Sequence, residues 1–430
     1  MRTARAIRRT RWPRWLLALA ALLLLLAALV AWLNVRGEGA IEPGSAPAKS
    51  ADQNVISRGA YLARAGNCMG CHTTVGGAEF AGGGAVNTPF GAVVAPNITP
   101  DVKTGIGNWS PSEFWRAMHH GRAKDGRLLY PAFPYPSYTK VTREDADALY
   151  AYLRTVKPVD QPNKAHQLLF PYNTQAALGV WRALFFRAGD FESEPQQSAQ
   201  WNRGKYLVDA LSHCAACHSS RNFLGGTSVN AEFAGGLMPD QTWYAPSLAS
   251  PSEAGVQKWP RDEVVQLLKN GISAHGAVSG PMADVVYTST QYLSTQDLAA
   301  MADYLAAIPV RERERKEVVR AGSDVIARGS KLYEQQCASC HGDKGQGVES
   351  MYPALAGNRD VLLDSPNNLV QIVRKGGFSP ATAGNPQPFG MPPFGQTLSN
   401  DEIAAVITYV RQSWGNASNP VSAFDVLKVM

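Results

Sequence analysis

Charged residues are scarce in this chain of 430 residues. Lys, Arg, Asp and Glu together make up 18% of it, compared with about 25% in an average soluble domain. Residues 1–36 hold seven of the 41 basic residues and none of the 35 acidic ones, so the rest of the chain is close to neutral. A neutral body offers no basic surface to phosphate groups, which argues against nucleic acid as a partner.

The chain also lacks the short motifs of several common enzyme classes. It contains no Rossmann fingerprint, no P-loop and no Ser-His-Asp signature. We therefore predict no catalytic side chains and expect the chemistry to come from a bound cofactor.

One hydrophobic run is long enough to cross a membrane. Trp15–Leu33 spans nineteen residues without a charge, whereas a spanning helix needs about 17–25 residues and a signal-peptide core about 7–15. Six arginines precede it, so the positive-inside rule predicts that residues 1–14 stay in the cytoplasm and later residues are exported. Residues 1–36 are then a retained anchor or a cleaved signal, with 44–48 as a candidate processing site, and residues 37–54 form a tether.

All six cysteines fall in three copies of one motif, Cys-x-x-Cys-His, which attaches haem c. A zinc site typically needs two such pairs together, and a thioredoxin-like motif needs no following His. A disulfide across two residues closes too small a loop to stabilise a fold. We therefore predict three covalently bound haem c groups. The thiols are those of Cys68, Cys71, Cys214, Cys217, Cys337 and Cys340, and the proximal iron ligands are His72, His218 and His341.

Each motif lies in the same sequence frame. The first cysteine follows an Arg-Gly pair, by 10, 11 and 9 residues from the Arg, and a capped helix with apolar periodicity comes later, beginning after Thr142, Ser294 and Ser399. An opening helix, a haem loop and a closing helix are typical of a class I cytochrome c domain. We predict an all-α chain with three tandem domains behind one transmembrane helix. The domains are 55–160, 199–310 and 323–430, with an apolar connector at 161–198 and a charged linker at 311–322.

The apolar connector has two interpretations. Its runs Leu168–Pro171 and Val180–Phe186 are typical of a helix that seals a contact between domains. They are also typical of a face that docks on a membrane or a partner subunit.

Methionine opposite histidine gives a haem a raised potential suited to electron transfer. In the third domain Met391 lies in a proline-stiffened loop before the closing helix, and Met282 has the same setting in the second, so both are predicted sixth ligands. The first domain has Phe133 in the equivalent loop. Its sixth ligand is Met118, or one of His119 and His120, or the position is open.

These motifs resemble the triple-haem cytochrome c subunits of membrane-bound bacterial dehydrogenases that oxidise alcohols, aldehydes, gluconate or fructose. The resemblance covers Ser57 to Trp414 and includes Asn97–Asp101, Leu129–Ala132, Ser289–Leu293 and Met391–Phe394. It implies a body in the periplasm beside the inner membrane, a dehydrogenase catalytic subunit as electron donor, and ubiquinone or a terminal oxidase as acceptor. It also implies the histidine ligands named above, with Met282 and Met391 opposite two of them.

The first domain resembles one branch of that family more than the others. The alcohol dehydrogenase branch has Met where this chain has Phe133. Phe there, with Met in a stretch like Met118–Gly121, is similar to cytochromes that accompany molybdenum hydroxylases. The resemblance favours an aldehyde-type partner built from molybdopterin and iron–sulfur subunits over a quinoprotein or flavoprotein.

We therefore expect a membrane-anchored electron relay without a substrate site of its own. Two other functions fit the same motifs. One is a haem enzyme such as a peroxidase, which would use an open iron in the first domain. The other is a free-standing electron carrier.

Overall fold

A computed structural model of the chain describes residues 12–39, 52–227, 231–312, 317–349 and 351–429. The arginine-rich residues 1–11, most of the predicted tether and the middle of the predicted charged linker lie outside the described residues. We refer to residues 53–153, 199–307 and 323–428 as the first, second and third units.

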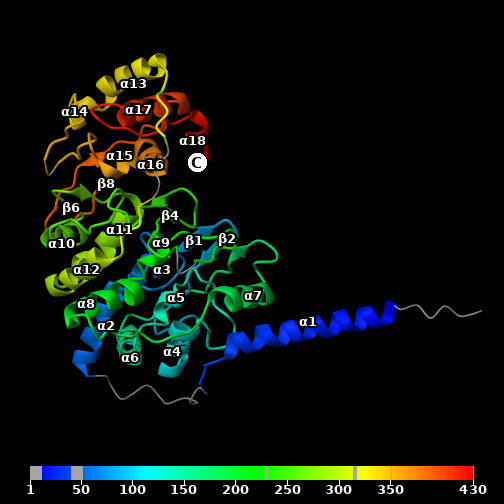
Figure 1. Cartoon of the computed structure of the whole chain (residues 1–430). Coiled ribbons are helices and arrows are strands. Elements are labelled where there is room, and N and C mark those ends of the chain that lie inside the picture. Colours follow the sequence, from blue (N-terminus) through cyan, green and yellow to red (C-terminus); the bar gives the residue numbers. More distant parts are fainter. Residues whose placement is uncertain (1–11, 40–51, 228–230, 313–316, 350, 430) are drawn as a thin grey trace, which may run out of the picture.

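Helix α1 (Trp12–Val35) forms the predicted hydrophobic segment. Its alanines and leucines are strong helix formers, and its apolar side chains are exposed. Residues 14–35 are long and apolar enough to cross a membrane, by length and composition. Figure 1 shows α1 projecting away from the body.

Three pairs of long helices repeat one crossing (Figure 1). The opening helices are α2 (Gln53–Ala65), α8 (Ala199–Lys205) with its continuation η1 (Tyr206–Leu211), and α13 (Ser323–Gln336). They pack on the closing helices α6 (Arg143–Leu153), α12 (Thr295–Ala307) and α17 (Asn400–Gln412). Each crossing needs a glycine, because a Cβ there would overlap a carbonyl oxygen of the closing helix. The pairs are Gly59 with Ala148, Gly204 with Ala300 and Gly329 with Ala405.

The closing helices begin where the sequence predicts. The side chains of Thr142, Ser294 and Ser399 accept hydrogen bonds from backbone N–H groups three residues later, and Ser399 forms a full capping box with Glu402. Each cap satisfies one of the unpaired N–H groups at a helix start.

The second opening helix absorbs an extra residue. Its Arg-to-Cys spacing is 11 residues rather than 10 or 9, and η1 is a π-helix, the form that accommodates one additional residue in an α-helix. Asp209 is buried there, and Tyr304 Oη donates to both of its carboxylate oxygens at 2.9 Å. Burial raises the pKa of Asp209 to about 6.

Short strands and helices fill the loops between opening and closing helices, so the predicted all-α description is incomplete. Strands β1 (Ala85–Thr88), β2 (Gly91–Val94) and β3 (Gln167–Leu168) form an antiparallel sheet that joins the first unit to the connector. Two-residue ladders pair β4 (Gly236–Leu237) with β5 (Tyr244–Ala245), β6 (Ile272–Ser273) with β7 (Gly276–Ala277), and β8 (Gly377–Phe378) with β9 (Gly390–Met391). The loop helices are α4 (Pro111–His120), α5 (Tyr135–Tyr138), α10 (Arg261–Asn270), α11 (Gly280–Thr288), η3 (Thr290–Tyr292), α15 (Arg359–Leu362) and α16 (Asn367–Lys375). Two further helices follow closing helices: α7 (Gln175–Phe185) lies in the connector after α6, and α18 (Ala423–Lys428) follows α17.

The first and second units share one hydrophobic core, whereas the third has its own. A reciprocal pair of hydrogen bonds crosses between the first two. Tyr61 Oη donates to Asp297 at 2.7 Å, and Tyr206 Oη donates to Asp145 at 2.6 Å. The third unit contacts the second through Asn368, whose side chain bonds both backbone polar groups of Tyr244.

We predict that Gly329→Ala destabilises the third unit by about 1–2 kcal/mol. Overpacking typically costs about 1–3 kcal/mol, which exceeds the gain of about 1 kcal/mol in helix propensity. Thermal unfolding monitored by circular dichroism measures the change, with Ser330→Ala in the same helix as control. A Gly329→Ala protein that is as stable as wild type would contradict the tight crossing.

We also predict that Asp209→Asn changes how stability depends on pH. The carboxyl binds its proton more tightly when folded, since its pKa is about 6 rather than the ordinary 3.8. It therefore lowers stability as pH rises from about 4 to about 6, by at most about 3 kcal/mol. Melting temperatures between pH 4 and pH 8 should fall less steeply for Asp209→Asn than for wild type. Asp303→Asn, at a part-exposed site, should keep the wild-type slope, and equal slopes for all three proteins would refute the prediction.

Candidate haem centres

The three Cys-x-x-Cys-His motifs follow the opening helices as short helical turns, α3 (Cys68–His72), α9 (Ala215–His218) and α14 (Ala338–His341). All six thiols are free. Burial raises the pKa of Cys68 and Cys214 to about 12 and that of Cys337 to about 11, so these thiols are uncharged. Within the described ranges no three His, Cys, Asp or Glu side chains converge on one point.

The histidine of each motif has the same hydrogen bond. Nδ1 lies 2.7 Å from the carbonyl oxygen of Pro96 for His72, 2.7 Å from that of Pro246 for His218, and 2.9 Å from that of Pro353 for His341. A carbonyl can only accept, so Nδ1 carries the proton and Nε2 keeps its lone pair. Burial lowers the pKa of all three histidines. A neutral ring with a fixed tautomer and a free Nε2 is the form that ligates iron.

Sequence reasoning missed the three prolines that accept these bonds. Each lies in a loop after its motif, in Ala95-Pro96, Ala245-Pro246 and Tyr352-Pro353. A proline recurring downstream of every motif was the available signal.

The first and second motifs lie close together. Desolvation raises the pKa of Cys71, and the neighbouring Cys217 of the second motif raises it further. The Tyr138 ring packs edge-on against His213 with centroids 5.5 Å apart, and Tyr138 Oη donates to Gly66 O at 3.1 Å. The third motif lies in the separate part of the molecule formed by α13 and α17 (Figure 1).

The two methionines predicted for the second and third centres have different settings. Met391 is half-buried in β9, in an extended loop as predicted. Met282 lies instead in the first turn of α11, so its predicted setting in an extended loop is wrong. Pro281 sits at the start of this helix, where a missing N–H costs nothing. Met282 is half-buried against the shared core.

The three candidate sixth ligands of the first centre lie together at the end of α4. Met118 is buried in the shared core, which Cys68 and Phe133 border. His119 points elsewhere, because neighbouring helix residues diverge by about 100°, and it stacks on Trp115 with ring centroids 4.5 Å apart. His120 packs edge-on against His119, and burial lowers its pKa to about 4.

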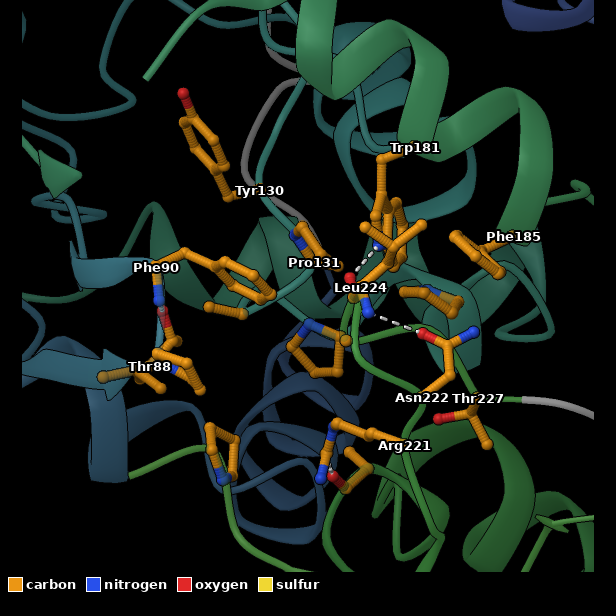
Figure 2. Close-up of a pocket in the computed structure, with 18 of the residues that line it drawn as sticks. Thr88, Phe90, Tyr130, Pro131, Trp181, Phe185, Arg221, Asn222, Leu224 and Thr227 are labelled. Atoms are coloured by element: carbon orange, nitrogen blue, oxygen red, sulfur yellow. Dashed lines mark hydrogen bonds between the residues drawn. The ribbon is translucent and has the colours of Figure 1, made fainter. Parts of the chain in front are cut away.

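A cavity of about 970 Å³ lies between the connector and the first two units. Tyr130, Pro131, Trp181 and Phe185 line it, and it reaches the second motif at Ala215 and Ala216. Figure 2 shows Trp181 beside the loop at Leu224, with Trp181 Nε1 donating to Leu224 O at 2.9 Å.

The end of α1 is bonded to the body near the first centre. Arg182, buried in α7, donates from Nε to Asn34 Oδ1 at 2.9 Å and from Nη2 to His120 O at 2.7 Å. Arg122 donates to Asn34 O and to Glu38 Oε2, each at 3.0 Å. Glu38 opens the predicted tether, so that segment begins as a fixed part of the body.

Comparison with known proteins places this chain in a family. A cytochrome c family model matches residues 56–157 and 326–414. The chain is 39% identical over 396 residues to the cytochrome c subunit of alcohol dehydrogenase (quinone) of Gluconacetobacter polyoxogenes, covering 88% of this chain and 85% of that protein. It is 37% identical over 431 residues to the fructose dehydrogenase cytochrome subunit of Gluconobacter japonicus, covering 93% and 87%. It is 39% identical over 363 residues to a nicotinate dehydrogenase subunit of Pseudomonas putida, covering 83% of this chain and 30% of that protein. The chain therefore belongs to the family of dehydrogenase cytochrome c subunits, electron-transfer proteins with covalently bound haem c.

Proposed function

We propose that this chain carries electrons through three haem c groups from a dehydrogenase catalytic subunit to ubiquinone or another respiratory-chain acceptor. The observation that carries the proposal is the repeated site, with two free thiols beside a histidine whose Nδ1 bonds a proline carbonyl. The family model leaves the second motif unmatched. The bond at His218 has the same length as that at His72, which supports counting the second site.

The chain's own residues hold and tune the groups, and haem c supplies one-electron redox chemistry. The six cysteines would bind the haem groups through thioether bonds. His72, His218 and His341 present Nε2, and the proline carbonyls keep each ring from turning. Met118, Met282 and Met391 provide soft ligands that favour reduced iron. The hydrophobic cores around them exclude water.

The arrangement of the units suggests the direction of electron flow. The second unit contacts both others, so it is the middle of the chain of centres. The third unit is remote from α1 and is free to meet a catalytic subunit. The cavity beside the second motif lies near the end of α1 and is apolar enough for a quinone head group.

The partner is a dehydrogenase. We infer which class of dehydrogenase it is from the residues around the first haem centre. Met118 is buried in the shared core that Phe133 borders, which fits the pattern of cytochromes that serve molybdopterin and iron–sulfur subunits. The relatives are named for nicotinate, alcohol and fructose dehydrogenases, which supports a dehydrogenase as the partner. Relatives that match more than four-fifths of this chain are named for dehydrogenases, which favours a relay subunit over the rival functions, a peroxidase-like enzyme and a free-standing carrier.

We further propose that α1 is a retained anchor in the bacterial inner membrane, with the units in the periplasm. Trp15 and Trp32 flank the apolar stretch, as aromatic residues do at the two interfaces of a membrane span. Cleavage after residue 48 would remove Asn34 and Glu38, and would leave Arg122 and Arg182 without these partners.

Intact mass spectrometry of the purified protein tests both proposals. We expect the mass of the uncleaved chain plus three haem c groups. A mass with fewer groups would refute the three-site proposal, and a chain that begins beyond residue 48 would refute the retained anchor.

Redox titration tests the sixth ligands. Met391→Ala should lower the potential of one haem by on the order of 100 mV, within the range of about 0.8 V that axial ligands span. The matched control Met351→Ala, at an exposed site in the same unit, should leave all potentials unchanged. Met282→Ala and Met118→Ala should each lower the potential of a different haem. An unchanged set of potentials in any of these three variants would remove that methionine from the ligand set.

A further inference from the structure

An uncharged, exposed surface covers the connector beside α1. Residues 165–181 contain no Lys, Arg, Asp or Glu, and large apolar side chains project from this region. Phe170 is 82% exposed and Phe223 is 88% exposed. We name Leu169, Phe170, Val180, Leu184 and Phe223 the connector patch. Val180, Leu184 and Phe223 lie together around one cavity, and exposed apolar side chains gathered in this way mark an interaction site rather than a solvated face.

Helix α7 has no polar stripe facing outward. It buries Leu178, Gly179 and Arg182 against the body, while Val180 and Leu184 are exposed one turn apart. A surface helix of a soluble protein normally carries charged or polar residues on its outer face. The only ionic side chain of α7, Arg182, is the one it buries.

The contacts between α7 and α1 fix the position of α7 relative to the bilayer. Asn34 Nδ2 donates to Gly179 O at 2.8 Å, so α7 meets the last turns of the membrane helix. Trp32 lies in the same turn, with the Arg36 guanidinium 5.8 Å from its ring. Trp and Arg together mark the boundary between the bilayer and water. Figure 1 shows α7 beside the end of α1 that enters the body.

The hydrogen bonds of Asn34 and Glu38 hold this geometry. Arg122 bonds both residues, and Arg182 bonds Asn34 from within α7. Glu38 and Arg122 are both largely buried, so solvent screens their ion pair of 3.0 Å only weakly. The connector patch therefore cannot swing away from the plane in which α1 enters the bilayer.

We propose that the connector patch lies in the lipid interface, so that the body docks on the bilayer as well as being tied to it by α1. This rests on the proposed retention of α1 as an anchor. Val180 and Leu184 also line the cavity beside the second motif. One rim of that cavity is then in contact with lipid, which gives a hydrophobic molecule a path from the bilayer without crossing water.

The test uses the full-length haem-loaded protein with its companion subunits, reconstituted in nanodiscs that contain a diazirine-bearing phosphatidylcholine. After irradiation, peptide mass spectrometry locates the lipid adducts. We expect adducts on α1, on residues 168–185 and at Phe223. Phe424 and Phe378 are exposed to a similar degree, 70% and 71%, but lie in the third unit, away from α1, and should carry none.

The outcomes separate the two proposals. Adducts confined to α1 would overturn the docking of the connector patch and leave the anchor in place. Adducts on neither segment would overturn both.

A matched pair of variants adds a second measurement. Leu184→Glu should reduce lipid adducts on α7 several-fold without changing the melting temperature in detergent, because Leu184 is exposed. Phe424→Glu should leave adducts on α7 unchanged. Equal adduct yields in wild type and Leu184→Glu would count against the proposal.

Discussion

The close crossing of an opening helix and a closing helix is the constraint on which each unit depends. At Gly59, Gly204 and Gly329 the two backbones approach too closely for any side chain. The crossing fixes where the opening helix ends, and the haem motif begins within a few residues of that end. Because the motif is so short, the crossing sets where its cysteines and histidine lie, and the proline carbonyls then fix the histidine rings. The contact between the two helix backbones therefore positions the cysteines and histidine of the motif, although these residues lie outside the two helices.

The three units have the same pair of crossing helices but differ in how they pack on one another. Tyr61 and Tyr206 occupy equivalent places in the first two opening helices and bond each other's closing helices. The third opening helix has Lys331 at that place, and a lysine ammonium is strongly hydrated. The first two units therefore fuse into one core, while the third keeps a separate core and a polar opening helix. One residue position thus differs between the two units that share a core and the unit that keeps its own.

Much of this architecture could be predicted from the sequence, because it depends on local signals. The capping residues Thr142, Ser294 and Ser399 lie beside the helices they start. The spacing of the Cys-x-x-Cys-His motifs is itself enough to predict haem c attachment. What escaped prediction depends on distant contacts. Met282 was expected in an extended loop but lies in a helix, and the two-residue strands carry too few residues for a periodic pattern. Glu38 was assigned to a tether, since nothing near it in the sequence indicates Arg122, which lies 84 positions away.

The buried Arg182 joins two parts of the molecule that have separate tasks. Its guanidinium bonds Asn34 in the hydrophobic helix and the last carbonyls of α4, the helix that carries Met118. A form made by trimming the N-terminus would therefore lose the Asn34 contact together with the apolar helix. It would free one end of α4, and the surroundings of Met118 in such a truncated protein would be a poor guide to those in the full-length protein.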